Sequence, residues 1–540
     1  MNQNSTALAD NPSGLAQLVQ RLQDPACFPH PVDRFQVIET HISFVLLTGP
    51  FAYKFKKPLD LGFLDFSTLE KRRFYCHEEW RLNRRLAPDL YLDVVAVGGT
   101  PDRPRILESG YGGDILDYAV RLVQFPAQAE LDAVAERGAL TARHIDRLAD
   151  IVADFHQRTP KARLESLYGT PAMVADRMRQ NFDQIAERVA GDWERERREQ
   201  LLEWTLATTT GLRNDLDLRR RQGWVRECHG DLHLGNIVLL EDEPVPFDCI
   251  EFSPELRWID TLSDTAFLLM DLHHRDLETL ANRFLNRYLE ATDDYMGLTV
   301  LPLYLVYRAM VRAKVAAIGA AQHRQDPAFQ AAALQQCSAY LQRAETYTRP
   351  RSCTPLVITY GVSGSGKTWL SERLLEHCGA IRVRSDVERK RLLELPPDAT
   401  THGLLNEGAY RPEVTLLTYK RLQALAFGVV DAGFPVIVDA TFLDRSFRQM
   451  FRRLAEVAGI PFVILACKAP EPVLRERVVQ RARAGGDASE ATLAVLDHQL
   501  AHQDPLDAEE QACAIEVDTA GRVDVDRIST LLRNAGGLNK

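Results

Sequence analysis

Residues 355–368, PLVITYGVSGSGKT, restrict the fold more strongly than any other segment of this sequence. The apolar run LVITY predicts a buried strand, and the glycine-rich residues after it predict a loop that opens a helix. Such glycines let backbone N–H groups surround an anion, the lysine reaches the terminal phosphates of a nucleotide, and the threonine hydroxyl can ligate Mg²⁺. The segment therefore predicts a nucleotide-binding loop, formed by Gly361, Ser363, Gly364, Ser365, Gly366, Lys367 and Thr368.

The sequence after this loop alternates apolar strands with helical segments. PVIVDATF at 435–442 and PFVILACKA at 461–469 are typical of strands, and a helical pattern follows each of them. This alternation implies a mainly parallel sheet with right-handed crossovers. We expect Asp439, at the end of one strand, to support a magnesium site beside Thr368.

Three charged residues in this part of the chain are candidates for catalysis. Asp386 follows a short predicted strand in RSDVERKRL. Arg477 and Arg481 are four positions apart and therefore share one face of a predicted helix. Positive charges there would stabilise the negative charge of a phosphoryl group during transfer. A solvated helix face is the alternative interpretation of the two arginines.

With these motifs, residues 354–540 resemble the gluconate kinase, zeta toxin and polynucleotide kinase group of P-loop kinases. The resemblance implies a P-loop NTPase fold and ATP as the phosphoryl donor. It also implies that Asp386 activates the hydroxyl of an acceptor, and that Arg477 and Arg481 contact the transferred phosphate from a lid helix.

A second group of polar residues lies in HGDLHLGN, residues 229–236, and in the apolar segment that follows. Asp231 precedes Asn236 by five positions, and Asp248 lies twelve residues after Asn236 across a predicted hairpin. Transfer of a phosphoryl group to an alcohol requires one group to orient or deprotonate the hydroxyl and nearby oxygen ligands for Mg²⁺. We expect Asp231 in the first role, and Asn236 and Asp248 in the second.

Residues 30–340 resemble the aminoglycoside phosphotransferase and choline kinase families through His229, Gly230, Asp231, Asn236 and Asp248. The resemblance implies a bilobal, protein-kinase-like fold. It implies that Asp231 is the catalytic base and that Asn236 with Asp248 holds magnesium. It further implies a phosphate-holding Lys54 in FAYKFKKP, with Glu79 of the following helix as its ion-pair partner.

The sequence does not decide which lysine and which glutamate form this ATP site. Strand alternation puts Lys56 on the same face as Lys54, and Glu78 is an alternative to Glu79. No G-x-G-x-x-G loop precedes Lys54, and THIS at 40–43 stands in its place.

Two further features of this region are interpreted as structural. Asp260 and Asp264 are four apart on one predicted helix face, and we expect them to support the catalytic loop. His229 has no histidine or cysteine partner at zinc-ligand spacing, so we expect it to brace the same loop.

The chain is expected to contain two domains, because 540 residues exceed what one core supports. The first, residues 1–348, would have a strand-rich small lobe at about 30–125 and a mostly helical large lobe at about 126–345. A linker is predicted at 349–355, and residues 356–540 would form the P-loop domain. The predicted fold class is α+β for the first domain and α/β for the second.

Composition excludes some partners and locations. The formal net charge of -10 provides no general attraction for nucleic acid or anionic membranes. Nine cysteines without a C-x-x-C pair fit a reducing compartment. No secretion signal is evident at the first residues, and the best apolar run is far shorter than a membrane span. We therefore expect a cytoplasmic protein.

These observations lead to one main hypothesis and two alternatives. The main hypothesis is a bifunctional kinase in which both domains transfer the γ-phosphate of Mg-ATP to a hydroxyl of a small molecule. In the first alternative the N-terminal module is a pseudokinase or regulatory binder, since it lacks the glycine-rich loop. In the second the P-loop domain is a nucleic-acid 5′-hydroxyl kinase, which the acidic charge disfavours. The sequence identifies neither acceptor nor the oligomeric state.

Overall fold

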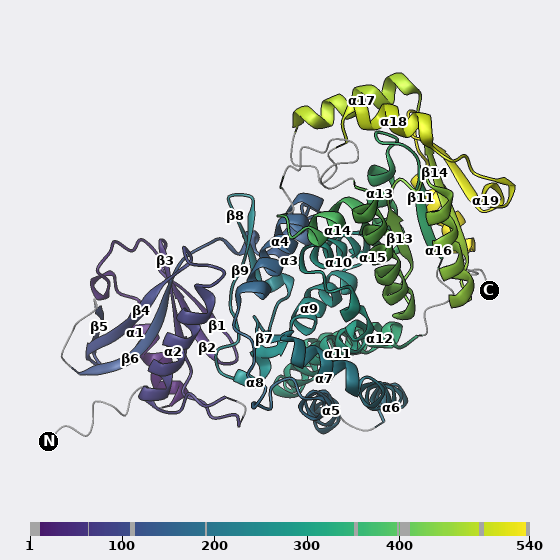
Figure 1. Cartoon of the computed structure of the whole chain (residues 1–540). Helices are drawn as coiled ribbons and strands as arrows, with labels where there is room; N and C mark the ends of the chain where they lie inside the picture. The colour runs from purple at the N-terminus through teal and green to yellow at the C-terminus, as the bar shows by residue number, and fades with distance from the viewer. Residues whose placement is uncertain are drawn as a thin grey trace. The chain divides into compact units, whose positions relative to one another are not determined.

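The computed structural model describes residues 11–62, 64–107, 114–189, 192–349, 355–396, 399, 411–484 and 491–535 (Figure 1). Contacts divide the chain into two compact units. Unit 1 comprises Met1–Gln180 and Thr209–Asp271, and unit 2 comprises Asn181–Thr208 and Leu272–Lys540. The predicted domain boundary near 348 falls inside unit 2 and stays a prediction. Most of the predicted linker, residues 350–354, lies outside the described residues.

Unit 1 contains a six-stranded antiparallel sheet with the strand order β1-β2-β3-β6-β4-β5. Its two faces carry different side chains, because alternate residues of a strand point to opposite sides. On β3, Tyr53 and Phe55 pack with Leu15 and Leu18 of α1 (Pro12–Arg21) in one apolar cluster. Its strands are β1 (Gln36–Glu39), β2 (Ser43–Leu47), β3 (Phe51–Lys56), β4 (Tyr91–Thr100), β5 (Arg103–Leu107) and β6 (Ile115–Val123).

Helix α2 (Leu69–Asn83) packs against β4 and β6 of this sheet. Thr68 caps its N-terminus, because the hydroxyl accepts a hydrogen bond from the backbone N–H of Lys71 at 3.3 Å. Cys76 of α2 shares an apolar cluster with Ala52 and Val120 of the sheet. Lys54 and Lys56 have the same strand parity as Ala52, so α2 covers the face that carries them.

The rest of unit 1 is mostly helical, with two short strand pairs. In the hairpin of β8 and β9, Glu241 and Asp242 form the two-residue turn with φ of 50° and 67°. This left-handed pair is the geometry that two-residue hairpins favour. The elements are α1 (Pro12–Arg21), α3 (Leu131–Glu136), α4 (Ala142–Arg158), α5 (Pro171–Arg188), α7 (Arg213–Gln222), β7 (Val225–Glu227), β8 (Ile237–Leu240), β9 (Glu243–Pro246), α8 (Pro254–Arg257), β10 (Trp258–Asp260) and α9 (Thr261–His274).

Unit 2 contains a five-stranded parallel sheet with the order β12-β13-β11-β14-β15. Val357, Ile437 and Leu465 from its central strands are buried with Leu370 and Leu374 of α13. The strands are β11 (Leu356–Tyr360), β12 (Ile381–Arg384), β13 (Val436–Asp439), β14 (Phe462–Lys468) and β15 (Ala514–Asp518). The predicted α/β architecture with a parallel sheet is confirmed.

Helices connect these strands, and further helices precede β11 in the same unit. The element α10 contacts α13 and β12, and α11 packs along α12. The helices are α6 (Arg195–Gly211), α10 (Glu278–Thr292), α11 (Leu301–Gln322), α12 (Pro327–Thr348), α13 (Lys367–Cys378), α14 (Ser385–Leu392), α15 (Pro412–Asp431), α16 (Arg445–Ala458), α17 (Glu471–Ala484), α18 (Leu493–His502), α19 (Ala508–Ala512) and α20 (Val525–Ala535).

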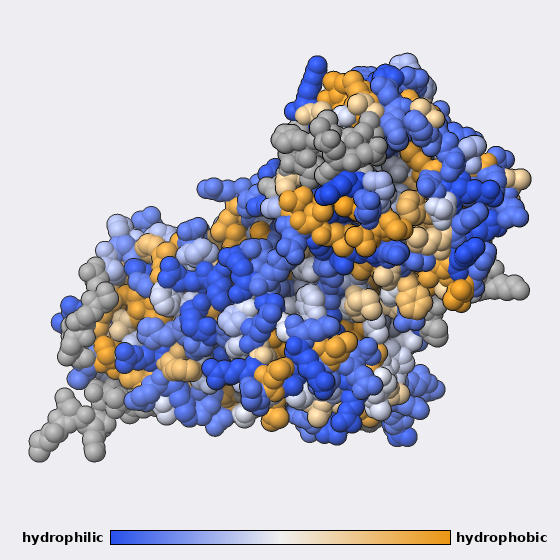
Figure 2. All heavy atoms as spheres, viewed as in Figure 1, coloured by the Kyte–Doolittle hydropathy of each residue, from blue (hydrophilic) through white to orange (hydrophobic). Residues whose placement is uncertain are grey.

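Among the described residues, no helix combines the length and apolar character needed to cross a membrane. On the face shown in Figure 2, hydrophilic residues cover most of the surface and hydrophobic residues appear in separate groups.

Candidate active sites

In unit 1 the loop after β7 is held by a buried carboxylate. Asp264 of α9 accepts hydrogen bonds from the backbone N–H groups of His229 and Gly230, at 2.9 and 2.8 Å. Gly230 has φ of 89°, and a Cβ there would lie 2.9 Å from the carbonyl oxygen of Leu256, so only glycine fits. His229 is buried, and its Nε2 lies 2.8 Å from the carbonyl oxygen of Phe247. The expected bracing roles of Asp264 and His229 are confirmed.

Asp260 does not support that loop in the expected way. Its carboxylate forms a buried two-point ion pair with Arg219 of α7, at 2.7 and 2.8 Å. It therefore ties α7 to β10, and the shared helix face inferred from the spacing is wrong because Asp260 ends β10 before α9 begins.

Asp231 and Asn236 are in direct contact. Asn236 Nδ2 donates to the carboxylate oxygen Oδ2 and to the backbone oxygen of Asp231, both at 2.9 Å. Asp231 remains 36% exposed, so its carboxylate is accessible. A short 3-10 turn over Leu234–Asn236 produces this approach.

Both candidate lysines of β3 bind the same buried carboxylate. Lys54 Nζ lies 2.9 Å from Glu79 Oε1, and Lys56 Nζ lies 2.6 Å from Glu79 Oε2. Lys54 also pairs with Asp248, whereas Lys56 pairs with Glu251. Lys54 is 15% exposed and Lys56 is completely buried. Lys54 is therefore the lysine that adjoins the predicted metal ligand, and Lys56 belongs to the interior of the lobe.

Glu78, the alternative to Glu79, points elsewhere. It pairs with Arg81 of the same helix at 2.9 Å and with Arg257 at 3.4 Å. Burial opposes ionisation of the Glu79 carboxyl, but the Lys54 and Lys56 ammonium groups outweigh burial and lower its pKa to about 2.

The backbone at Asp248 has an uncommon conformation. Its φ is 63°, in the left-handed region that residues other than glycine seldom adopt. Two side chains hold the segment: the Asp248 N–H donates to Tyr91 Oη at 3.2 Å, and the Cys249 N–H donates to Asn83 Oδ1 at 2.8 Å. Sequence reasoning missed Tyr91, Asn83 and Glu251. Of these three, only Glu251 could have been suspected from the sequence, because it lies three residues after Asp248.

In unit 2 the loop between β11 and α13 turns at three glycines with positive φ. Gly361, Gly364 and Gly366 have φ of 145°, 82° and 84°. A Cβ on Gly364 would lie 2.8 Å from the carbonyl oxygen of Leu474, so the loop depends on glycine there. Lys367 Nζ folds back to donate to the carbonyl oxygen of Val362 at 2.8 Å. Burial lowers the pKa of Lys367 below its ordinary value, although Asp439 opposes this.

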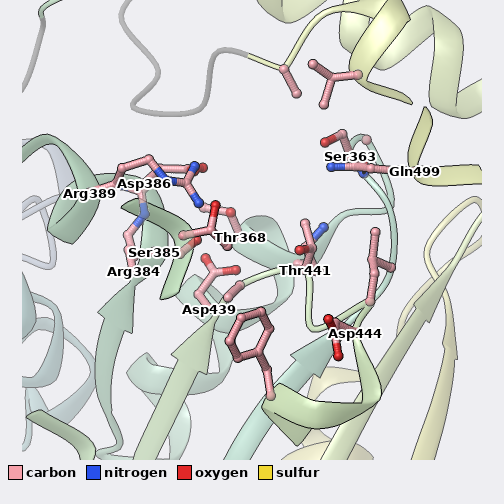
Figure 3. A pocket seen from close by; sticks show the side chains of 18 of the residues that line it. Ser363, Thr368, Arg384, Ser385, Asp386, Arg389, Asp439, Thr441, Asp444 and Gln499 are labelled. Atoms are coloured by element: carbon pink, nitrogen blue, oxygen red, sulfur yellow. The ribbon is translucent and has the colours of Figure 1, made fainter. Parts of the chain in front are cut away.

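A cavity of about 640 Å³ opens beside this loop and brings the sequence-predicted residues of the module together. Figure 3 shows Thr368, Asp439 and Asp386 around one opening. Ser371 Oγ donates to Asp439 at 3.2 Å, which fixes the carboxylate against α13. The predicted site residues among those that line the cavity are Ser363, Gly364, Gly366, Lys367, Thr368, Asp386, Asp439, Arg477 and Arg481.

Strand register explains why Asp386 reaches the cavity. In the parallel pair of β12 and β13, Arg384 lies opposite Asp439. Both strands therefore end at the same edge of the sheet, where α/β folds place their ligands. Helix α14 starts at once with Ser385 and Asp386, and Arg389 Nη1 lies 3.4 Å from Asp386 Oδ1.

Arg477 and Arg481 of α17 have different partners. Arg477 donates to the carbonyl oxygens of Gly364 and Thr519, at 3.2 and 2.7 Å, and therefore braces the phosphate-binding loop. Arg481 Nη2 is buried and has no hydrogen-bond partner among the described residues. The expected contact of both arginines with a transferred phosphate stays a prediction, and Arg481 is the one with an unused donor.

Helix α18 also reaches the loop through a residue that sequence reasoning missed. The backbone N–H of Ser363 donates to Gln499 Oε1 at 2.7 Å (Figure 3). Nothing in the sequence near Gln499 signals this contact, because it joins residues 136 positions apart.

The residues present fit a nucleotide and a magnesium ion. The loop glycines are packed closely against the rest of the unit, since a Cβ on Gly364 would lie 2.8 Å from the carbonyl oxygen of Leu474. Beside the loop, Lys367 and Arg481 would supply positive donors, and Thr368 with Asp439 would supply oxygen ligands. In unit 1, Lys54 is paired with Glu79 and would bind phosphate oxygens from that position, and Asn236 and Asp248 carry oxygen atoms that suit Mg²⁺.

Comparisons with known proteins identify two kinase-family segments. Residues 76–298 match the family described as "Phosphotransferase enzyme family", and residues 356–506 match the family described as "AAA domain". Both resemblances stated for the sequence are therefore confirmed, and the protein carries a phosphotransferase-family segment followed by a P-loop kinase domain.

Solved structures with similar regions include several kinases. The amicoumacin kinase hAmiN, solved with AMP-PNP, Ca²⁺ and Ami, is 13% identical over 57% of this chain and 88% of its own, with a TM-score of 0.37. A sugar kinase from Janibacter sp. HTCC2649 is 21% identical over 34% of this chain and 96% of its own, with a TM-score of 0.27.

Among curated proteins, the Mycobacterium tuberculosis (strain H37Rv) protein named "Uncharacterized protein Rv2004c" is 30% identical over 506 residues. The match covers 92% of this chain and 95% of the mycobacterial protein, so it includes both segments. The Mycobacterium bovis protein named "Uncharacterized protein Mb2027c" matches equally well. The chain belongs to the family of these mycobacterial proteins.

Proposed function

We propose that this protein is an ATP-dependent phosphotransferase with two active modules, each of which phosphorylates a hydroxyl of a small molecule. The observation that carries the proposal is the cavity where Lys367, Thr368, Asp439 and Asp386 meet. Its volume of about 640 Å³ is within the usual range for small-molecule sites. These residues supply a phosphate clamp, metal ligands and a base, which are the parts that phosphoryl transfer needs.

Mg-ATP would supply the phosphoryl group, which forms a bond to the acceptor oxygen as the bond to the ADP oxygen breaks. Asp386 takes the proton of the acceptor hydroxyl on its carboxylate. Lys367 holds the terminal phosphates, and Thr368 and Asp439 would hold the magnesium ion. Arg481 stabilises the charge that spreads over the transferred group.

The first module performs the same chemistry with a different set of residues. Asp231 accepts the proton of its own acceptor hydroxyl, and Asn236 orients that carboxylate through the contact at 2.9 Å. Lys54 binds phosphate oxygens while Glu79 fixes its ammonium group. Asn236 and Asp248 would hold magnesium. The presence of all five groups supports catalysis in this module over a purely regulatory role.

The test uses the full-length protein with Mg-ATP and pools of small-molecule alcohols, with products identified by mass spectrometry. Asp231→Asn and Asp386→Asn should each remove a different product, with a loss of at least about a hundredfold, because each removes a general base. The matched controls, Asp89→Asn in unit 1 and Asp431→Asn in unit 2, change exposed carboxylates and should leave both products.

Three outcomes would contradict parts of the proposal. Unchanged products in both catalytic variants would show that the assigned bases are wrong. Full activity of Asp231→Asn alone, with no product missing, would favour a regulatory first module. Labelling of 5′-hydroxyl oligonucleotides in place of small molecules would make the P-loop module a nucleic-acid kinase.

A further inference from the structure

Helix α10 lies against the P-loop module although it belongs to the segment that matches the phosphotransferase family (Figure 1). Both elements are part of unit 2. At the N-terminal half of α10, Asn282 Nδ2 donates to the carbonyl oxygen of Glu376 at 3.0 Å. Arg283 pairs with Glu372 at 3.0 Å and with Glu376 at 2.5 Å. Polar and charged groups therefore fasten α10 to the end of α13, the helix that begins at the phosphate-binding loop.

The middle of α10 binds the backbone of an edge strand. Strand β12 is at one end of the sheet order, where its one partner among the described strands is β13. Asn286 Nδ2 donates to the carbonyl oxygen of Ala380 at 2.9 Å, and the Arg382 N–H donates to Asn286 Oδ1 at 2.7 Å. The Asn286 side-chain amide thus forms the hydrogen bonds that a neighbouring strand would form with one N–H group and one carbonyl oxygen at the edge of the sheet.

One turn further along α10, Glu290 binds two arginines of β12. Its carboxylate lies 3.3 Å from Arg384 Nη1 and 3.6 Å from Arg382 Nη2, and only 14% of the Glu290 side chain is exposed. Arg391 of α14 donates to the carbonyl oxygen of Glu290 at 2.6 Å. Burial disfavours the charged carboxylate, but Arg384 and Arg382 outweigh it and lower the pKa of Glu290.

Arg384 connects this contact to the proposed active site. It lines the cavity, and Asp386 follows two residues later in the first turn of α14 (Figure 3). Asp293, just after α10, adds a second attachment, because it pairs with Arg421 of α15 at 2.6 Å. The same Arg421 also pairs with Glu388 of α14. The β12–α14 corner that carries Asp386 is therefore held to α10 from both sides.

We propose that α10 positions the acceptor side of the P-loop active site, with Glu290 and Asn286 as positioning residues for the segment Arg384-Ser385-Asp386. The inference rests on the proposed function of Asp386. Glu290 fixes the guanidinium of Arg384, and Asn286 fixes the backbone of β12. A base displaced by about 1 Å loses most of its rate advantage, so these contacts control transfer without touching the nucleotide.

The test compares Glu290→Gln and Asn286→Ala with Glu278→Gln in the full-length protein. Glu278 is on the same helix, its side chain is 52% exposed, and its carboxylate faces Arg343 at 3.8 Å. The first measurement is hydrogen exchange with and without Mg-AMP-PNP. Both positioning variants should increase exchange at 381–392, while exchange at β11 and nucleotide protection at 361–368 should equal those of the wild type.

The second measurement is formation of the product that Asp386→Asn removes. Its kcat/KM for the acceptor should fall about tenfold or more in Glu290→Gln and Asn286→Ala, with an unchanged KM for ATP. Glu290→Asp, which keeps the charge, should recover part of the loss. Glu278→Gln should behave as the wild type.

The outcomes separate this inference from the proposed function. Wild-type exchange at 381–392 in both variants, or a fall in nucleotide protection at 361–368 that accounts for the whole loss of activity, would overturn the positioning role. Absence of nucleotide protection at 361–368 in the wild-type protein would instead contradict the proposed function. Increased exchange at β11 in Glu290→Gln would mean that this variant is unfolded. The exchange at 381–392 in Asn286→Ala and Glu290→Asp would then test the positioning role.

Discussion

Glu79 binds Lys54 through one carboxylate oxygen at 2.9 Å, and its other oxygen binds Lys56 at 2.6 Å. The two lysines should therefore differ sharply when each is replaced by methionine. Lys54→Met should abolish the product that depends on Asp231 and change stability little, because Glu79 keeps Lys56. Lys56→Met should destabilise unit 1 by roughly 3 kcal/mol or more, because it leaves Glu251 buried without its cation.

Urea denaturation measures the free energy of unfolding of both variants, and hydrogen exchange at 51–56 measures the local stability of β3. Equal loss of stability with no selective loss of product in Lys54→Met would mean that Lys54 has only a structural role.

The buried Glu79 carboxylate should make the stability of unit 1 sensitive to acid. Its folded-state pKa of about 2 is below its ordinary 4.5, so its contribution is present above pH 4.5 and is lost as pH falls towards 2. In Glu79→Gln the fall in thermal midpoint over this pH range should be smaller than in the wild type. Burial raises the pKa of Glu251 above its ordinary value, so ionisation of this carboxyl lowers the stability of unit 1 as pH rises above 4.5. Glu251→Gln should remove that loss of stability and leave the acid side of the thermal-midpoint profile unchanged. Identical profiles for Glu79→Gln and the wild type would contradict this assignment.

Arg477 and Arg481 should separate into a structural and a catalytic effect. Arg477→Ala removes donors to the carbonyl oxygens of Gly364 and Thr519, so it should increase hydrogen exchange at 361–368 in the protein without nucleotide. Arg481→Ala should leave that exchange unchanged and lower kcat for the product that depends on Asp386 by about a hundredfold or more.

Arg475→Ala is the matched control, because Arg475 is on the same helix and pairs with Glu471 and Asp497 at the surface. An Arg481→Ala variant with wild-type kcat would show that Arg481 does not stabilise the transferred phosphoryl group.

Gln499 should compete with nucleotide for one amide of the phosphate-binding loop. Its Oε1 occupies the Ser363 N–H, which is therefore not free for a phosphate oxygen. Gln499→Ala should raise the affinity of the P-loop site for AMP-PNP by up to about tenfold, the value of one hydrogen bond. His502→Ala, an exposed change on the same helix, is the control. Calorimetric titration in a Lys54→Met background isolates the P-loop site, and lower affinity in Gln499→Ala would show that Gln499 helps to bind the nucleotide.

Much of each candidate site was predictable from local sequence. The loop at 361–368 was recognisable from its own residues, because glycines at positive φ followed by a helix are the local signature of a phosphate-binding nest. The same holds for Asp231 and Asn236, whose contact is made by one short turn. Strand alternation correctly put Lys54 and Lys56 on one face of β3. These are relations within a few residues, where chain geometry leaves few choices.

The sequence could not decide between groups whose difference lies in tertiary packing. Lys54 and Lys56 share a face of the strand, and only the carboxylates brought by the segment after β9, Asp248 and Glu251, distinguish them. Asp260 and Asp264 have helical spacing, but strand pairing removes Asp260 from the helix. A helical periodicity of 3.6 residues does not indicate which distant residue of the chain will contact a given side chain.

The sequence by itself determined the two kinase-type motifs, the parallel α/β architecture after residue 355 and most of the residues proposed for each candidate site. Only the tertiary structure decided that Lys54 adjoins Asp248, that Gln499 occupies the Ser363 amide, and that α10 holds β12 through Asn286 and Glu290. The physical reason is sequence separation. Motifs reflect backbone geometry over a few residues, whereas these contacts join groups roughly 90 or more positions apart and depend on how whole elements pack.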